Sequence, residues 1–394
     1  MSFTNLKEEG RITTFQLAPT HVTYANTLRR LILTGVETVA FRADMTATGT
    51  TTDVEIVRND TPMTNEMLAD RIGLLPVHVL EPLKWKKDEY IFELEVKGQE
   101  GKTTFVESKH FNLKSKALVL GQDDDEKSAP ATAFFPPNPI TGNTCLIATL
   151  QPGTGPTQQV VRLKAAASIG TGREHARFSP VSQCSYEYTM DESEDRRRTM
   201  LLEWLDTAKK ASGVDLESER GKELIREFET MQIKRCFKIN DKGEPDSFNF
   251  TIESAGVLPV SYIVDRACAV GEQMCSQYMH LHMGDLPDDV IVSTSDSRMI
   301  GYDFLFQKHD HTLGNLLQTW LVEHHIEGGE LPKVTYAGYA VPHPLRDEMV
   351  LRIGVEDRSE QTARLAIATA AKGCVAMFTN LRAKWREAMG GNGQ

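Results

Sequence analysis

Cysteine and histidine side chains are the first candidates for chemistry in this chain, because transition metals prefer them as ligands. Cys268 and Cys275 lie seven positions apart on one predicted helix, which separates them by roughly 10 Å, too far for a shared ion or a disulfide. His280 and His282 lie two positions apart, so they face different directions near a helix end. Two further pairs lack cysteines or carboxylates at ligand spacing, namely His309 with His311 and His324 with His325. We predict no bound metal.

Two other patterns resemble sites for phosphate or magnesium. Gly170 and Gly172 are spaced like the start of a phosphate loop, but the third glycine and the Gly-Lys-Ser/Thr ending are missing. The acidic run from Asp123 to Glu126 is typical of a solvated loop, since a Lys-Ser-Ala-Pro segment follows it directly. No serine or cysteine stands in a recognisable nucleophile elbow. We predict no catalytic residue and no cofactor in this chain.

The composition is that of a globular protein with little affinity for nucleic acid. The 394 residues include 40% hydrophobic and 25% charged residues and carry a formal net charge of −11. This length favours two or three domains. Direct binding of nucleic acid needs a concentrated basic face, and the run Arg196-Arg197-Arg198 directly follows acidic residues, as in a solvated helix end. We expect little or no direct nucleic-acid contact.

The six cysteines include no Cys-x-x-Cys pair, which indicates a reducing compartment. The first nine residues contain no apolar signal region, and no run approaches the ~20 apolar residues of a membrane span. We therefore expect a soluble intracellular protein without membrane contact.

One structural module occurs twice, once near each end of the chain. An apolar run at 15–17 precedes a turn and the segment Thr23–Arg30, and a similar run at 304–306 precedes Thr312–Thr319. Both segments fit the pattern Thr-x-(Ala/Gly)-Asn-x-Leu, and we expect each threonine to cap a helix. A strand is predicted after each helix, at 39–41 in the first copy and at 334–339 in the second.

Each copy closes with a strand and a long helix. The strands are predicted at 248–252 and 349–353, and the helices begin near Pro259 and after a capping Ser359. Steps of four and three residues give each helix an apolar stripe. The stripes are Ile263, Ala267, Val270, Met274 and Leu281 in the first helix, and Ala363, Ile367, Ala370, Cys374, Met377, Leu381 and Trp385 in the second. We expect the stripes to bury each other, so that one chain forms an intramolecular pseudo-dimer.

A large insert interrupts the first copy. We predict an α+β chain in which residues 1–45 and 241–285 form a discontinuous first dimerisation module and residues 46–240 form a mostly β inserted domain. A linker at 286–299 leads to the second dimerisation module at 300–394. Within the insert we expect strands at 54–57 and 90–96, a helix at 64–72, and two polar helices between 192 and 231. Loops rich in Pro, Gly and acids are expected at 121–143 and 151–157.

Seven segments carry a recognisable pattern in a fixed order. They are Asn-Thr-Leu-Arg-Arg at 26–30, Val-Glu-Ile-Val-Arg-Asn-Asp-Thr at 54–61, Ala-Asp-Arg-Ile-Gly-Leu-Leu-Pro at 69–76, Gly-Arg-Glu-His-Ala-Arg-Phe-Ser-Pro at 172–180, Ile-Glu-Ser-Ala-Gly at 252–256, Asp-His-Thr-Leu-Gly-Asn at 310–315 and Tyr-Ala-Gly-Tyr-Ala-Val-Pro-His-Pro-Leu at 336–345. With them the chain resembles the alpha-type assembly subunits of DNA-directed RNA polymerase. Residues up to about 285 resemble the third-largest subunit of the eukaryotic and archaeal enzymes, and those from about 300 resemble its smaller, eleventh-type partner. Fusion of the two is similar to what large cytoplasmic DNA viruses of eukaryotes encode.

The resemblance implies that the helix with Arg29 and Arg30, and its counterpart in the second copy, face the two large catalytic subunits. Arginine suits such contacts because its planar fork pairs with carboxylates, although an amphipathic helix also needs solvent-facing residues. The implied partner-interface residues are Asn26, Leu28, Arg29, Arg30, Arg71, Arg173, His175, Arg177, Asn315 and His343. Small zinc-containing polymerase subunits are further expected partners, and no homo-oligomer is expected.

The chain departs from the family pattern at three places. Residues 77–144 contain no cysteine, so the zinc loop common in the larger partner is absent. Asp70 stands where the family usually has histidine, and Gln318 stands where the smaller partner has a basic residue. These departures concern surface contacts and leave the predicted fold unchanged.

The hypothesis is a non-catalytic assembly platform of a multisubunit RNA polymerase, located in the virion and host cytoplasm if viral and otherwise in the nucleus. Charge reversal at Arg29 and Arg30 is then expected to leave the chain folded but to block recruitment of the second-largest subunit. The alternative is an independent transcription regulator with the dimer fold, which would need an exposed basic face. An enzyme would need a convergent set of titratable groups.

Overall fold

The computed structural model describes residues 1–44, 46, 52–87, 89–115, 130–153, 158–211, 213–295 and 299–391. The fold is α+β, as predicted. The chain divides into two compact units, one formed by 1–31, 183–253 and 264–394 and the other by 32–182 and 254–263. The acidic run at 123–126, and parts of the loops predicted at 121–143 and 151–157, lie outside the described residues. Within the described ranges, no helix combines the length and apolar character needed to cross a membrane.

The first copy of the module is a four-stranded antiparallel sheet with two helices. Its elements are β1 (Ser2–Glu9), β2 (Ile12–Ala18), α1 (Val22–Thr34), β11 (Val181–Tyr188), β12 (Phe248–Ser254) and α6 (Val260–Ser276). The strands lie in the order β1-β2-β12-β11. Every second residue of β12 is buried, which places the side chains of Phe248, Phe250 and Ile252 in the core.

The second copy repeats this topology without interruption. Its elements are β13 (Val290–Thr294), β14 (Gly301–Gln307), α7 (His311–Leu321), a π-helical turn (Val322–Ile326), β15 (Tyr336–Ala340), β16 (Glu348–Gly354) and α8 (Glu360–Gly391). The strand order β13-β14-β16-β15 equals that of the first sheet, element by element. The predicted repeat is therefore confirmed at the level of topology.

The match between the sheets corrects three sequence expectations. The counterpart of β15 is β11, not the strand at 39–41, because β3 (Glu37–Ala40) pairs with β10 (Ser168–Thr171) in the other unit. The predicted insert of 46–240 includes residues 183–240, which lie in the same compact unit as residues 1–31 and 264–394. The predicted linker of 286–299 contains β13, whose β-branched Val-Ile-Val run pairs with β14. Residues 296–298 of the predicted linker lie outside the described part of the chain. The edge strand β1 was not predicted at all.

The unit of residues 32–182 and 254–263 is mostly β, as predicted for the insert. β4 (Val54–Asn59), β9 (Val160–Ala165), β5 (Tyr90–Lys97) and β7 (Phe111–Ser115) form one sheet in that order, and β6 (Thr104–Glu107) pairs with β8 (Leu146–Leu150). The helices are α2 (Asn65–Gly73), α3 (Ala131–Phe134) and 3-10 turns at Pro82–Lys84, Ser108–His110 and Ala176–Phe178. Thr64 caps α2 by accepting a hydrogen bond from the backbone of Met67. Phe41, Phe92, Phe111 and Phe135 form the aromatic centre of its core.

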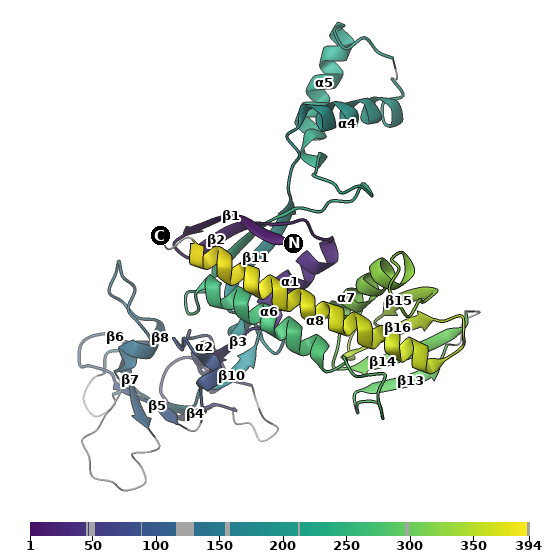
Figure 1. Cartoon of the computed structure of the whole chain (residues 1–394). Coiled ribbons are helices and arrows are strands. Elements are labelled where there is room, and N and C mark those ends of the chain that lie inside the picture. The colour runs from purple at the N-terminus through teal and green to yellow at the C-terminus, as the bar shows by residue number, and fades with distance from the viewer. Residues whose placement is uncertain are drawn as a thin grey trace. The chain divides into compact units, whose positions relative to one another are not determined.

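The two polar helices predicted between 192 and 231 are α4 (Glu194–Thr207) and α5 (Glu219–Met231), followed by a 3-10 turn at Ile233–Arg235. Figure 1 shows them as a separate helical pair reached through the segments between β11 and β12. Their small core contains Leu205 and Phe228, with the Trp204 ring 5.8 Å from the Phe228 ring.

Candidate functional site

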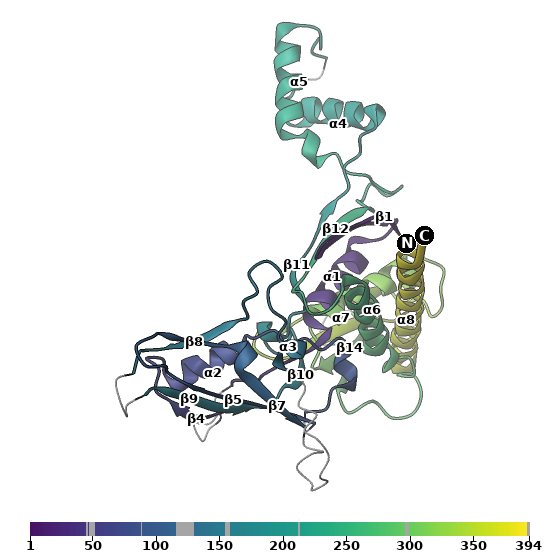
Figure 2. The same cartoon turned by 90° about the vertical axis from the view of Figure 1, so that its left-hand side faces the viewer.

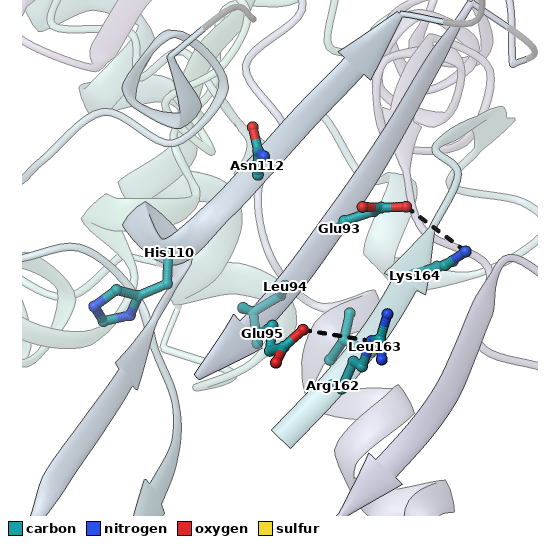
Figure 3. Close-up of a pocket in the computed structure, with 8 residues that line it drawn as sticks. All are labelled: Glu93, Leu94, Glu95, His110, Asn112, Arg162, Leu163 and Lys164. Carbon is teal, nitrogen blue, oxygen red and sulfur yellow. Dashed lines mark ion pairs between the residues drawn. The ribbon is translucent and has the colours of Figure 1, made fainter. Parts of the chain in front are cut away.

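A shallow cavity lies on the β5, β7 and β9 face of the inserted unit (Figure 3). Its volume is about 260 Å³. Glu93 pairs with Lys114 and Lys164, at 2.9 and 3.6 Å, and Glu95 pairs with Arg162 at 3.5 Å. The hydrogen bond from Lys114 lowers the pKa of the Glu93 carboxyl. Every second residue of a strand points to the same face, so this ladder of matched charges is typical of a solvated sheet surface.

The histidine and cysteine candidates lie in structural positions. In the part of the chain that the structure describes, no group of three or more His, Cys, Asp or Glu side chains is placed to hold a metal. His324 stacks on Trp320, with ring centroids 4.2 Å apart, and lies 3.2 Å from a carboxylate oxygen of Glu330. His325 is fully buried, with Nδ1 3.0 Å from the Pro332 carbonyl.

The helices α6 and α8, one from each module, contact each other. The helices lie side by side in both views (Figures 1 and 2) and run antiparallel, since Asp265 near the start of α6 meets Arg382 near the end of α8. At the crossing, the Phe378 ring covers Gly271, where a Cβ atom would lie 2.8 Å from ring carbons. Glycine is therefore required for this close approach.

A pair of buried thiols lies at the same contact. Cys275 of α6 and Cys374 of α8 are both fully buried, and burial together with the neighbouring Cys275 raises the pKa of the Cys374 thiol. The raised pKa keeps the Cys374 thiol protonated at neutral pH, so Cys374 packs as a small apolar side chain.

Beyond the N-terminal start of α6, α8 continues onto the sheet of the first module. The ring of Trp385 is fully buried and lies 5.0 Å from Phe3 and 5.3 Å from Phe15, between centroids. Phe15 in turn stacks on Phe250 at 5.1 Å. The second module thus completes the core of the first.

Charged groups flank this apolar contact. Asp265 accepts hydrogen bonds from Arg382 at 3.0 Å and from Arg386 at 2.5 Å, and Glu272 lies 3.7 Å from Arg382. Burial raises the pKa of the Asp265 carboxyl, but the bonds from Arg386 and Arg382 outweigh burial and leave the pKa below its ordinary value. The carboxylate is therefore held ionised between two arginines.

The predicted stripes match this contact only in part. Ile263, Ala267, Ile367, Ala370, Cys374, Leu381 and Trp385 are buried, whereas Val270, Met274 and Met377 are only half-buried. The contact instead uses Gly271, Cys275 and Phe378. At Val270, Met274 and Met377 the contact residue is the next one along the chain, because steps of four and three residues fix the apolar side of a helix only to within about one position.

A second contact joins α1 to α7. Thr319 donates to Thr23 at 3.0 Å between hydroxyl oxygens, and Asn315 Nδ2 lies 3.4 Å from the same Thr23 oxygen. Tyr24 donates to Glu323 at 2.5 Å, and burial followed by the bond to Glu323 raises the pKa of the Tyr24 hydroxyl. Thr23, Tyr24 and Thr319 are buried between the modules, where these bonds satisfy their hydroxyl groups.

The caps of these helices differ from the prediction. His21 Nδ1 accepts from the Thr23 amide at 3.1 Å, and Asp310 accepts from the Thr312 amide at 2.7 Å. Each helix begins before its threonine, so the predicted threonine caps are wrong. The threonines lie two positions past the caps and use their hydroxyls between the modules instead.

Arg30 contacts the second module. Its Nε donates to the Thr312 hydroxyl at 2.8 Å, and its Nη2 lies 3.2 Å from a carboxylate oxygen of Asp310. The expectation that charge reversal at Arg30 would affect only an external partner is therefore corrected, since the reversal would place two carboxylates together inside the chain.

Comparison with known proteins gives matches over both copies. The description RNA polymerase Rpb3/Rpb11 dimerisation domain matches residues 14–275 and, separately, residues 302–384. The first match alone spans more than half of the chain. The chain belongs to the RNA polymerase Rpb3/Rpb11 dimerisation family. It is an alpha-like RNA polymerase subunit.

Curated relatives of this family come from several lineages. The chain is 24% identical over 294 residues to DNA-directed RNA polymerases I and III subunit rpac1 of Dictyostelium discoideum, covering 69% of this chain and 79% of the relative. It is 27% identical over 285 residues to DNA-directed RNA polymerases II, IV and V subunit 3 of Arabidopsis thaliana, covering 64% and 82%. It is 24% identical over 261 residues to DNA-directed RNA polymerase subunit Rpo3 of Methanosphaera stadtmanae, covering 63% and 86%.

The residues of the family segment at 26–30 differ in their burial and in their contacts. Leu28 is fully buried and is excluded as a partner contact, because an apolar residue of the α1 stripe belongs to the core. Asn26 and Arg29 are half-buried, and Asn26 accepts from Arg29 Nε at 3.0 Å. Arg29 also lies near β11, where its charge acts against the burial that raises the pKa of Cys184.

The remaining predicted interface residues lie on both units. Arg71 of α2 donates to the carbonyls of Ile147 and Leu146, and Arg177 donates to the carbonyl of Phe41 with only 4% of its side chain exposed. Arg177 therefore has a structural role inside the chain, which corrects its assignment as a partner-interface residue. Arg173, His175 and His343 are exposed, and the two histidines accept hydrogen bonds from nearby backbone amides.

Sequence reasoning missed several residues that carry the contact between modules. Asp265, Glu323 and Asp310 were not identified, because a single carboxylate on a helix gives no sign of its partner. The one available signal was Gly271, an isolated glycine inside a strongly helical pattern, which usually marks close packing.

Proposed function

We propose that this chain is the assembly platform of a multisubunit DNA-directed RNA polymerase and brings the two large catalytic subunits together without catalysing a reaction itself. The observation that carries the proposal is that two family modules on one chain cover each other through α6 and α8, with Trp385 completing the core of the first module. A preformed pair offers a rigid base, because its own contacts are satisfied before a partner arrives.

The proposed contact residues are the predicted interface residues other than Leu28, Arg30 and Arg177. Asn26 and Arg29 lie half-buried on α1, and Asn315 lies half-buried on α7. Arg71, Arg173, His175 and His343 are exposed. Arginine, asparagine and histidine side chains form directional hydrogen bonds, which favour specific docking over nonspecific binding. Small zinc-containing polymerase subunits are proposed as further partners.

We also propose that the chain is a fusion of two separate polymerase subunits, of the kind that large cytoplasmic DNA viruses encode, and acts in the virion and host cytoplasm. In support, the match to each relative covers about four fifths of that relative but only about two thirds of this chain. α8 contacts the first module at residue 284. Only residues 285–289 separate this position from the start of β13. A short tether gives an effective concentration on the order of mM. Sequencing the gene's neighbourhood in its source genome tests the viral origin.

The decisive experiment for the platform role is purification of the protein from its source under native conditions. The proposal expects a complex with two very large chains that performs templated RNA synthesis. Recovery of this protein alone, shifting DNA in a gel, would instead favour the independent regulator and contradict the proposal.

Arg29→Glu tests the docking surface, with Arg30 left intact because it serves the contact between modules. We expect the variant to melt as the wild type does but to retain at most about a tenth of the second-largest subunit in co-purification, since a lost charge-assisted hydrogen bond costs about 1.5–3 kcal/mol. Arg11→Glu, on the exposed turn between β1 and β2, is the matched control and should bind normally. Full recovery of the large subunit with Arg29→Glu would remove this surface from the proposal.

A further inference from the structure

The outer face of the first sheet carries a second cavity, which is lined by residues of all four strands, β1, β2, β12 and β11. Its volume is about 370 Å³. The polar side chains that the two central strands contribute form what we call the cavity floor, and all are uncharged: Thr14, Gln16, Asn249 and Thr251. Charged side chains come only from the two edge strands, with Lys7 on β1 and Glu187 on β11.

The cavity on the inserted unit has the opposite character. There Glu93 pairs with Lys114 and Lys164, so the charges of that surface satisfy one another. Surfaces that face water are rich in charged residues, whereas the central part of a protein interface is depleted of them. The uncharged cavity floor of the first sheet therefore has the composition of a surface that another chain covers.

Side-chain hydrogen bonds fix the polar groups of this cavity. Asn5 Nδ2 donates to Gln16 Oε1 at 2.9 Å, and Gln16 Nε2 donates to the buried Ser247 hydroxyl at 2.8 Å. Thr189 donates to Asn249 Oδ1 at 3.0 Å. Asn5 has a left-handed backbone, with φ of 53°, where the register of β1 and β2 shifts, and such bulges redirect a side chain. The amides are thus held in place before a ligand arrives.

Other polar groups of the cavity floor remain available. In the part of the chain that the structure describes, neither Asn249 Nδ2 nor the hydroxyls of Thr14 and Thr251 have a hydrogen-bond partner. An extended peptide presents backbone carbonyls and amides in alternation. Its carbonyls can accept from the Asn249 amide, and its amides can donate to the two hydroxyls. The cavity floor is therefore complementary to a peptide backbone.

The segments 189–191 and 236–238 continue this face toward the helical pair (Figure 1). Met190 and Phe237 form an antiparallel bridge, and the Lys238 amide donates to the Thr189 carbonyl at 3.0 Å. This register sets Lys238 directly opposite Thr189, and residues in opposite positions share a face of the sheet, with Cβ atoms about 4.5–5.5 Å apart. Lys238 therefore adjoins the polar network of the cavity.

Two arginines of α4 join Lys238 at this end of the surface. Arg197 Nε lies 3.3 Å from the Asp191 carbonyl. The bonds from Ser193 lower the pKa of the Asp191 carboxyl, and the nearby charges of Lys238 and Arg196 lower it further. Among the described residues, none of the three cations lies within ion-pair distance of a carboxylate, and Arg196 Nε is buried without a hydrogen-bond partner. Positive charge is thus left unmatched beside the cavity.

We propose that this surface docks an extended acidic segment of a partner protein, with its carboxylates at Arg196, Arg197 and Lys238 and its backbone across the cavity floor. Arginine suits this role because its planar fork forms two hydrogen bonds with one carboxylate. Strands about 4.8 Å apart make four strands about 14 Å wide, so about eight extended residues at roughly 3.3 Å each cross the sheet and reach the cations. The proposal concerns binding alone and does not rest on the polymerase role.

A nucleic acid fits the same cations less well. Four acidic residues of the segment 191–195 directly precede the arginines, and the chain carries a formal net charge of −11. A DNA duplex carries one negative charge per roughly 1.7 Å of its axis, so its backbone would also bring phosphates against these acids. A peptide places carboxylates only where its sequence has them.

Fluorescence anisotropy with the full chain tests the proposal. The probe is a short labelled peptide whose acidic half is followed by a half made of serine and threonine. We expect saturable binding of this peptide, no binding of a version with lysines in place of the acids, and weaker binding of a labelled oligothymidylate of equal length. Equal binding of the lysine version, or tighter binding of the oligothymidylate, would overturn the proposal.

Single substitutions test both parts of the surface. Lys238→Gln and Arg196→Gln should each weaken binding on the order of tenfold, because each removes a charge-assisted hydrogen bond. Arg198→Gln, at an exposed position of the same helix, is the matched control and should stay within about twofold of the wild type. Asn249→Leu should weaken binding about fivefold, whereas Asn143→Leu, at an exposed asparagine outside the cavity, should not.

Thermal melts of each variant show whether a loss of binding reflects unfolding. Lys238 is exposed and its ammonium group makes no hydrogen bond within the described residues, so its substitution leaves the fold intact. Unchanged affinity of Lys238→Gln, or equal losses in Arg196→Gln and Arg198→Gln, would contradict the role of the cations. Unchanged affinity of Asn249→Leu would contradict the role of the cavity floor.

Discussion

The closing helices of the two modules have the same place in the fold but different tasks. α6 has 17 residues and α8 has 32, so they are about 25 and 48 Å long at 1.5 Å per residue. α6 contributes small residues such as Gly271 and Cys275 to the contact, whereas α8 contributes the rings of Phe378 and Trp385. One helix supplies the groove and the other supplies the side chains that fill it.

This difference shows that repeating a topology does not produce interchangeable copies. In the first module, Phe3 and Phe15 of the sheet are covered by Trp385, which the second module supplies. The following predictions test this dependence at three points where α8 contacts the first module.

Trp385→Ala should have the largest effect. The ring contacts Phe3 and Phe15 of the first module, and truncating a buried tryptophan costs about 3–5 kcal/mol. Urea unfolding followed by far-UV circular dichroism measures this loss. Glu387→Ala, an exposed residue two positions further along α8, should change stability by less than about 0.5 kcal/mol. Equal effects of both substitutions would show that α8 does not complete the first core.

Gly271→Ala should have an intermediate effect. Alanine normally stabilises a helix interior by about 1 kcal/mol, but here the new methyl carbon would lie 2.8 Å from the Phe378 ring. Overpacking costs about 1–3 kcal/mol, so the net result should be destabilisation. Thermal melts of Gly271→Ala and of the double variant with Phe378→Leu measure it.

Two comparisons interpret these melts. The smaller leucine should relieve part of the loss, because it removes the atoms that the methyl group strikes. Gly390→Ala, where a Cβ atom would meet nothing within 4 Å, should instead raise the melting temperature. A stabilising Gly271→Ala would mean that the two helices are not closely packed.

Asp265→Asn should have the smallest effect, about 1 kcal/mol at pH 7, because flanking ion pairs are partly exposed. Its signature is the pH dependence. The pKa of Asp265 is lowered in the folded chain, so its contribution is complete above the unfolded pKa of about 3.9. That contribution is lost as the pH falls below this value and passes through the folded pKa.

Unfolding free energies measured from pH 6 down to pH 2 distinguish the two proteins. The wild type should lose its advantage over the Asn variant as the pH falls, and the two curves should converge at the acid end. A constant difference at every pH would mean that the carboxylate charge contributes nothing.

The repeat could be predicted from the sequence because two separate segments of the chain encode the same topology. Apolar spacing located β2, β12, β14, β16 and the helices that follow them. It misassigned the strand after α1, because the chain enters the insert at that point and the true counterpart of β15 returns only at Val181. Order along the chain and order in the sheet diverge wherever an insert intervenes.

The residues of the contact were harder to predict for a different reason. Arg30 was recognised as functional from its family pattern, but its partners Asp310 and Thr312 lie far along the chain. The spacing of apolar residues predicts which side of a helix is apolar. It does not predict which polar group of another helix lies against that helix. The asymmetry between His21 and Asp310 becomes visible only when both caps are seen at one contact.

The aromatic cluster around Trp385 also constrains how the protein is made. Its members come from opposite ends of the sequence, and nearby Lys384 donates to the carbonyl of Met1 across 383 positions. Contacts of such long sequence separation form late, because closing the loop costs entropy before it yields any contact. During synthesis the first sheet therefore remains uncovered until the ribosome has produced α8. A product that terminates before Trp385 would leave Phe3 and Phe15 uncovered, and we expect chaperones and proteases to recognise this exposed aromatic surface.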